Sequence, residues 1–137
     1  MEPRKKLSKP HKDDRGFIQI LLHEHNGSVV VINTVPYVQR ANHYHKDDYH
    51  YCYVVEGKIT YYERKVGDKS IPKRYLFEKG DMFYTPAMME HCMYFDEPTT
   101  FIALGGKTRT QEEYEEDLVR LPSLHDDYIK NQMEGEK

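Results

Sequence analysis

The sequence has no tryptophan, only two cysteines, and no apolar run near the roughly 20 residues that a membrane-spanning helix requires. Two cysteines cannot form a disulfide framework. Cys52 and Cys92 lie in apolar strand-like runs, which predicts buried thiols in a reducing cytoplasm. The N-terminal stretch MEPRKKLSKPHKDDRG also lacks the apolar segment of a secretory signal. We therefore expect a cytoplasmic protein that does not enter membranes.

A strong charge of either sign is missing as well. The formal net charge of −3 over 137 residues gives no general attraction for nucleic acid or anionic membranes. This length suits one domain with a single core, and a mean hydropathy of −0.87 suits a soluble protein. Tyrosine is abundant, with 12 residues. It suits both sheet surfaces and pockets for polar ligands, and its abundance alone decides nothing.

Short β-like runs separated by turn residues fill most of the chain and predict an all-β sandwich or barrel. The runs cover residues 17–22, 28–35, 37–45, 50–57, 58–64, 74–78, 81–86, 91–95 and 100–104. We expect an N-terminal arm over residues 1–15 and a barrel over residues 16–110. A C-terminal helix or strand with a flexible tail should follow over residues 111–137.

The C-terminal segment carries its own signals. Thr110-Gln111-Glu112-Glu113 is a plausible capping box that opens a short helix through about Leu118. The stretch LVRL at residues 118–121 could equally add an edge strand. After Pro122 the charged sequence predicts a loose or partner-docked end.

Three histidines crowd one predicted hairpin. Side chains alternate along a strand, so His43 and His45 share a face with Cα atoms roughly 6.5 Å apart. Two imidazoles at this spacing can converge on a point near 2 Å from each ring nitrogen, as metal ligands do. His50 opens the next strand and shares a face with Cys52 and Val54, and if this face points inward, His50 can meet His43 and His45. The tyrosines of that strand should then face the other way.

Two motifs carry a resemblance to a known family. The string H-x-H-x4-H-x6-G runs from His43 to Gly57, and G-x5-P-x4-H runs from Gly80 to His91. Together they resemble the paired motifs of the cupins, which are small jelly-roll β-barrels, and the likeness covers about residues 16–106. The family usually has glutamate where this chain has His50, and often glycine where it has Met88.

The resemblance implies a polar pocket built from the histidines of both motifs, His43, His45, His50 and His91. A set of four imidazoles suits borderline metals such as Zn, Ni, Fe, Mn or Cu. A metal-free pocket that uses the same histidines as acid and base is the competing interpretation, because imidazole titrates near neutral pH.

Within the cupins, the chain resembles enzymes that act on nucleotide-linked keto sugars, the dTDP-4-keto-6-deoxyhexose 3,4-ketoisomerases and dTDP-4-dehydrorhamnose 3,5-epimerases. The likeness lies in the D-x-R-G entry at Asp13–Gly16, in RANHYHK from Arg40 to Lys46, where Ala41 replaces glycine, and in residues 110–120. It implies a nucleotide-sugar substrate and a single cytoplasmic jelly roll with a short C-terminal helix or tail. The exposed apolar and tyrosine-rich strands make us expect a homodimer.

Residue roles follow from this likeness. His43 and His45 are the candidate base and acid for proton transfer next to the keto group. A nearby tyrosine would donate a proton or hydrogen-bond the sugar, with Tyr53 and Tyr84 as candidates for the first role and Tyr51 and Tyr61 for the second. Arg40 either pairs with a diphosphate or is an ordinary exposed arginine.

Two alternatives of a different class stay open. One is a metal-dependent cupin with oxygenase-type or other metal chemistry at the four histidines. The other is a non-catalytic cupin that binds a small ligand or a metal. Fold alone does not decide among them.

Overall fold

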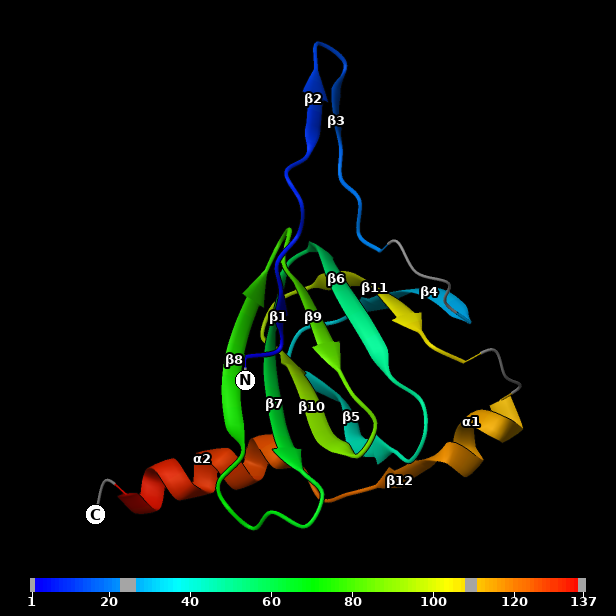
Figure 1. Ribbon diagram of the computed structural model, residues 1–137. Helices are drawn as coiled ribbons and strands as arrows, with labels where there is room; N and C mark the ends of the chain where they lie inside the picture. The colour runs from blue at the N-terminus through cyan, green and yellow to red at the C-terminus, as the bar shows by residue number, and fades with distance from the viewer. Residues whose placement is uncertain (1, 23–26, 108–110, 136–137) are drawn as a thin grey trace.

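Two five-stranded antiparallel sheets form the body of the protein (Figure 1). The computed structural model describes residues 2–22, 27–107 and 111–135. The first sheet contains, in spatial order, β1 (Arg4–Lys5), β9 (Met82–Thr85), β6 (His50–Glu56), β11 (Thr99–Gly105) and β4 (Ser28–Thr34). The second contains β12 (Leu118–Arg120), β5 (Val38–His45), β10 (Met89–Phe95), β7 (Lys58–Lys65) and β8 (Lys73–Glu78). The predicted all-β jelly roll is confirmed.

The core lies between the two sheets because side chains alternate along each strand. Phe83 and Phe101 point inward from the first sheet, and Tyr61, Phe77 and Phe95 from the second, all of them 0% exposed. Burial of each such ring contributes about 1.5–3 kcal/mol. The burial of these rings therefore determines which face of each strand points into the core.

The two cysteines are buried, as predicted. Cys52 and Cys92 are free thiols that are 5% and 0% exposed. Burial raises the pKa of both thiols to about 12. Both groups are therefore protonated and unreactive at neutral pH.

The N-terminal segment, expected to be an arm, contains three short strands. β1 pairs with Phe83 and Met82 of β9 and so covers the outer edge of the first sheet. A hairpin of β2 (His11–Asp13) and β3 (Gly16–Ile18) then projects away from the barrel (Figure 1). Its turn needs Gly16, whose φ of 134° suits glycine.

Both alternatives for the segment after the barrel occur together. Helix α1 (Gln111–Asp117) ends where the edge strand β12 begins, and β12 pairs with residues His43–His45 of β5. The proposed N-cap, Thr110, lies outside the described residues. This pairing brings the C-terminal segment beside the two histidines of the first motif.

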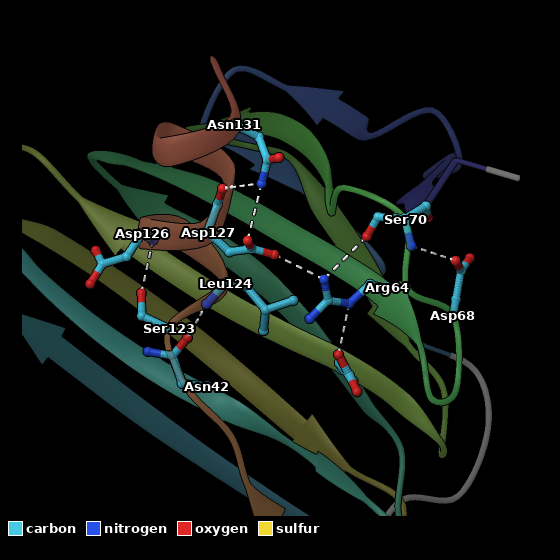
Figure 2. Close-up of polar contacts among 10 residues, drawn as sticks. Asn42, Arg64, Asp68, Ser70, Ser123, Leu124, Asp126, Asp127 and Asn131 are labelled. Atoms are coloured by element: carbon cyan, nitrogen blue, oxygen red, sulfur yellow. Dashed lines mark hydrogen bonds and ion pairs between the residues drawn. The ribbon is translucent and has the colours of Figure 1, made fainter. Parts of the chain in front are cut away.

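The segment after Pro122, expected to be a loose or partner-docked end, is not loose over residues 124–135, because helix α2 (Leu124–Gly135) packs on β10 and β7. Ser123 caps it, since its Oγ accepts a hydrogen bond from the Asp126 N–H at 3.0 Å. The Asn42 side chain accepts a second one from the Leu124 N–H at 3.0 Å (Figure 2). Leu124 is 0% exposed and anchors the helix.

An ion-pair bridge holds the same helix from the other side. The Arg64 guanidinium contacts Glu90 at 2.9 Å and Asp127 at 3.0 Å (Figure 2). Because Arg64 comes from β7 and Glu90 from β10, this bridge joins α2 to two strands of the second sheet. Neither α1 nor α2 is long and apolar enough to cross a membrane, and the described residues contain no other α-helix.

Candidate functional site

Four histidines from three strands meet at a cavity of about 400 Å³ between the sheets. β5 ends with His43 and His45, β6 begins with His50, and β10 carries His91 directly opposite His43 in the register. His43, His45 and His91 are 7%, 2% and 6% exposed, and His50 is half-buried. The structure therefore brings together all four histidines of the two motifs.

Ring-centroid distances give the shape of the cluster. His43 lies 4.9 Å from His45 and 4.8 Å from His91, and His45 lies 4.7 Å from His50. The possible ligand atoms fall into two groups that share His45, and all atoms within a group lie within 4.8 Å of one another. One group is His43, His45 and His91. The other is His45, Asp48 and His50.

Both groups fit a borderline divalent cation by donor type, because imidazole nitrogen and carboxylate oxygen are common ligands of such ions. In the first group, His43 Nδ1 is buried and has no hydrogen-bond partner. In the second group, the Asp48 carboxylate is a donor that the motif comparison missed. Whether a metal binds at the four predicted histidines stays a prediction.

Two of the buried imidazoles, His43 and His91, are neutral at neutral pH. Burial lowers the pKa of His43 to about 2, with a smaller contribution from the neighbouring histidines. Burial also lowers the pKa of His91 to about 3. Neutral imidazoles can accept a proton or bind a metal ion.

Hydrogen bonds orient His45 and His91. His91 Nδ1 donates to the Met89 carbonyl oxygen at 3.0 Å, and His45 Nδ1 donates to Asp117 Oδ2 at 3.1 Å. In both rings the Nδ1 proton is therefore used, which leaves Nε2 as the basic nitrogen. The Asp117 carboxylate also accepts the backbone N–H groups of Asp47 at 3.0 Å and Asp48 at 3.2 Å.

Helix α1 places Tyr114, which the sequence analysis did not single out, beside the histidines. The Tyr114 ring lies 5.5 Å from the His45 ring and 6.5 Å from the His43 ring, and it lines the cavity. α1 thus adds an aromatic wall through Tyr114 and a carboxylate through Asp117. No short motif in the sequence marks either residue.

Of the four candidate tyrosines, Tyr61 alone lines this cavity. It is 0% exposed, and its hydroxyl lies 2.7 Å from Thr85 Oγ1. Burial raises the pKa of Tyr61 well above its ordinary value, so the hydroxyl keeps its proton.

Tyr51, Tyr53 and Tyr84 do not line the cavity. Strand alternation turns them to the outer face of the first sheet when it turns His50 inward. Tyr51 and Tyr84 stand opposite each other there, with ring centroids 4.8 Å apart. Roles for these three tyrosines at the histidines would require a rearrangement of β6 and β9.

Two cationic side chains line the cavity. Arg40 is exposed and donates a hydrogen bond to the Asn33 carbonyl oxygen at 3.2 Å. Lys107, which sequence reasoning missed, pairs with Asp47 at 2.9 Å. Both side chains are exposed, and the charge of Lys107 is balanced by Asp47.

The two positions at which this chain replaces a glycine of the related motifs have unusual backbone angles. Ala41 has a φ of 73° and Met88 a φ of 59°, both in the left-handed region. This region costs an L-residue about 1–2 kcal/mol relative to glycine. The chain therefore keeps a left-handed backbone conformation near His43 and His91, although alanine and methionine adopt it less easily than glycine.

Comparison with known proteins identifies the family. The family described as Cupin domain matches residues 34–105, which is more than half of the chain. No curated protein matches. Several solved structures share the fold at sequence identities too low to show more than the fold.

One such structure is the capsular polysaccharide assembling protein CapF from Staphylococcus aureus, with a TM-score of 0.64 and 22% identity. The match covers 86% of this chain and 35% of that one, so the chain spans about a third of CapF. Another is the sugar 3,4-ketoisomerase QdtA from Thermoanaerobacterium thermosaccharolyticum in complex with TDP. It has a TM-score of 0.67 and 14% identity over 92% of this chain and 91% of that one.

A third structure is the epimerase RmlC from Legionella pneumophila in complex with dTDP-4-keto-L-rhamnose. Its TM-score is 0.69 and its identity 14%, over 88% of this chain and 72% of that one. The jelly-roll topology, the two histidine motifs and the family match agree with one another. This chain belongs to the cupin family.

Proposed function

We propose that this cupin is an isomerase or epimerase that acts on a nucleotide-linked 4-keto sugar by histidine-mediated proton transfer. The observation that carries the proposal is the pair of buried imidazoles, His43 and His45, whose rings lie 4.9 Å apart at a cavity of about 400 Å³. A cavity of this size is within the range of small-molecule sites. Fold relatives whose structures contain TDP or a dTDP-keto sugar support the substrate class.

The chemistry needs a base, an acid and little else. The 4-keto group acidifies the C3–H bond, a base takes that proton, and the electron pair forms an enediolate. Reprotonation at another carbon moves the carbonyl, and reprotonation on the other face of C3 inverts the centre. Both outcomes return the proton and need no external oxidant or reductant.

His45 suits the role of base. Its Nδ1 proton is donated to Asp117, so Nε2 holds the lone pair that accepts the C3 proton. The imidazolium that forms is stabilised by the Asp117 carboxylate, as in other histidine–aspartate pairs. His43 is then the second proton carrier, and the protonated hydroxyl of Tyr61 can hydrogen-bond the sugar.

Arg40 and Lys107 suit the diphosphate. Guanidinium and ammonium groups bind phosphate oxygens strongly, and both side chains line the cavity that holds the histidines. In this arrangement the sugar lies among the imidazoles and the nucleotide lies towards the entrance.

The test is proton exchange at C3 of TDP-4-keto-6-deoxyglucose in deuterated water, followed by NMR. We expect exchange with the unmodified protein and none with His45→Asn, which removes the base. The exposed His11 lies on the projecting hairpin, so His11→Asn is the matched control and should exchange normally. Absence of exchange, together with no thermal shift from dTDP or UDP, would contradict the proposal.

A metal-dependent cupin is the second candidate, supported by the orphaned buried His43 Nδ1 and the convergence of His43, His45 and His91. A bound Zn, Ni, Fe, Mn or Cu ion would supply Lewis-acid or oxygenase-type chemistry there. Elemental analysis of protein purified without a histidine tag separates this candidate from the metal-free one. Ligand or metal binding without any turnover would instead indicate a non-catalytic binding cupin.

We further propose that the protein is a homodimer. The projecting hairpin exposes Phe17 and Ile18 at 64% and 66%, and the edge strand β4 exposes Val29 and Val31 at 60% and 65%. Open strand edges with apolar side chains favour pairing with a second copy. Light scattering coupled to size exclusion would give the mass of two chains, and a monomer at micromolar concentration would contradict this.

A further inference from the structure

β5 changes the face that it turns inward partway along its length. Val38 packs against the core, and Gln39 points the other way, where its Nε2 donates to Asp126 of α2 at 3.2 Å. Regular alternation from these two residues would turn every odd-numbered side chain of the strand outward. His43 and His45 nevertheless line the cavity. The inward face therefore shifts by one residue between Gln39 and His43.

The shift is a β-bulge at Asn42. In the pairing of β5 with β10, His43 stands opposite His91 and Ala41 stands opposite Cys92, so Asn42 is the extra residue of β5. One extra residue exchanges the two faces of a strand, which is the change that β5 shows. Ala41 and Asn42 both have left-handed backbone angles, with φ of 73° and 55°. Asparagine adopts this region more easily than most residues.

Hydrogen bonds from the C-terminal segment fix Asn42 in this conformation. Its side-chain Oδ1 accepts the Leu124 N–H at the start of α2 at 3.0 Å (Figure 2). Its backbone carbonyl oxygen accepts the Leu121 N–H at 2.9 Å, and its Nδ2 donates to Gln39 Oε1 at 3.0 Å. The described residues of α2 do not line the cavity. Asn42 thus connects the first turn of this helix to the strand that carries two of the cavity histidines.

We propose that Asn42 is a positioning residue that holds the β-bulge against α2 and so turns His43 and His45 into the cavity. The left-handed backbone is unfavourable for most residues, and the hydrogen bonds with Leu121 and Leu124 offset that cost. Without the bulge the two faces of β5 would exchange, and both imidazoles would turn away from the cavity. α2 therefore acts on the site without lining it.

Chemical protection of the histidines tests this positioning without any substrate. Diethyl pyrocarbonate acylates accessible neutral imidazoles, and mass spectrometry of the peptides gives the rate at each histidine. His43 and His45 are 7% and 2% exposed, so they should react far more slowly than the exposed His11. In Asn42→Ala we expect both rings to react nearly as fast as His11. A residue that only capped α2 would lower the melting temperature and leave both rings protected.

The kinetic consequence rests on the proposed proton transfer. A misplacement of about 1 Å can cost roughly 100-fold in rate, so Asn42→Ala should lower kcat for C3 proton exchange by about 10- to 100-fold, with a smaller change in KM. Asn42→Asp keeps an oxygen acceptor for the Leu124 N–H and adopts left-handed angles readily. It should retain kcat within about threefold. If the unmodified protein exchanges no sugar proton, the proposed function fails, whereas the acylation rates still decide the positioning.

Asn131→Ala is the matched control, because the Asn131 side chain bonds to Asp127 of the same helix rather than to β5 (Figure 2). It should leave ring protection and kcat unchanged. All rates are measured well below the lowest melting temperature, so that global unfolding does not contribute. If Asn42→Ala does not fold, Asn42→Gly decides, since glycine accepts the left-handed angles and loses only the side-chain bonds. It should expose the same two rings to a smaller extent.

The proposal is overturned if the alanine variant, or the glycine variant where alanine does not fold, keeps both rings as protected as in the unmodified protein. Equal exposure of the rings in Asn131→Ala would also overturn it, because any loosening of α2 would then have the same effect.

Discussion

Replacing Asp117 by asparagine tests how His45 works in the proposed proton transfer. The carboxylate contacts His45 Nδ1 at 3.1 Å and also accepts the backbone N–H groups of Asp47 and Asp48. Asparagine keeps the size of the side chain and one acceptor oxygen, and it removes the negative charge. The negative charge matters most when His45 has taken the C3 proton and carries a positive charge.

The size of the effect follows from this contact. A hydrogen bond to a charged group is worth about 1.5–3 kcal/mol. Since 1.36 kcal/mol corresponds to a tenfold change in rate, Asp117→Asn should slow C3 proton exchange by roughly 10- to 100-fold. The contact strengthens as the proton moves, so we expect the loss in kcat, with KM nearly unchanged.

The assay is NMR-detected deuterium incorporation at C3 under saturating sugar. Glu115→Gln is the matched control, because Glu115 lies on the same helix and pairs with Arg120 at 2.9 Å on the surface. It should change the rate by less than about twofold, as expected for an exposed pair. An Asp117→Asn protein that exchanges at the normal rate would refute the assignment of His45 as the base.

Two further predictions concern stability. Ala41→Gly should raise the free energy of unfolding by about 0.5–1 kcal/mol, because glycine relieves the left-handed φ of 73° but adds freedom to the unfolded chain. Ala87, which has no positive φ, is the control, and its change to glycine should destabilise the protein by about 0.5–1 kcal/mol in urea unfolding. The second prediction is that the free energy of unfolding is constant above about pH 6.5 and falls at lower pH. Below that pH the histidines of the unfolded chain bind protons, whereas the buried His43 and His91 of the folded protein stay neutral. His43 and His91 together should give a slope of at most about 2.7 kcal/mol per pH unit. His125, whose pKa burial also lowers, adds to this slope, and Glu63, whose pKa burial raises, opposes it. His43→Asn should therefore reduce the slope by up to about 1.4 kcal/mol per pH unit, and an unchanged slope would contradict the buried, neutral state of this ring.

Strand periodicity and motif spacing predict the centre of the site well. Alternation along β5 and β6 places His43, His45 and His50 on the inner face, and the second motif brings His91 opposite His43. The same rule, applied to β6, also excludes Tyr51 and Tyr53 from the cavity. A place in the pocket for those two tyrosines is inconsistent with the inward orientation of His50.

Residues that reach the site from a distance could not be predicted in this way. Asp117 lies 72 residues after His45 in the sequence, and no spacing rule links the two. The docking of α2 is similar, because its N-terminus is capped by Asn42 from 82 residues earlier. The helix buries Leu124 in an otherwise charged segment, so its amphipathic signal is weak.

The first motif has His50 where the family usually has glutamate, and this change alone would remove a carboxylate from the site. Asp48 stands two residues before His50, in the turn between β5 and β6. The buried Asp48 Oδ2 lies 3.7 Å from His50 Nε2, so a carboxylate remains beside the position where the family usually has one. The imidazole at residue 50 and the carboxylate at residue 48 therefore act as a pair. The carboxylate near His50 therefore comes from a residue outside the usual motif position.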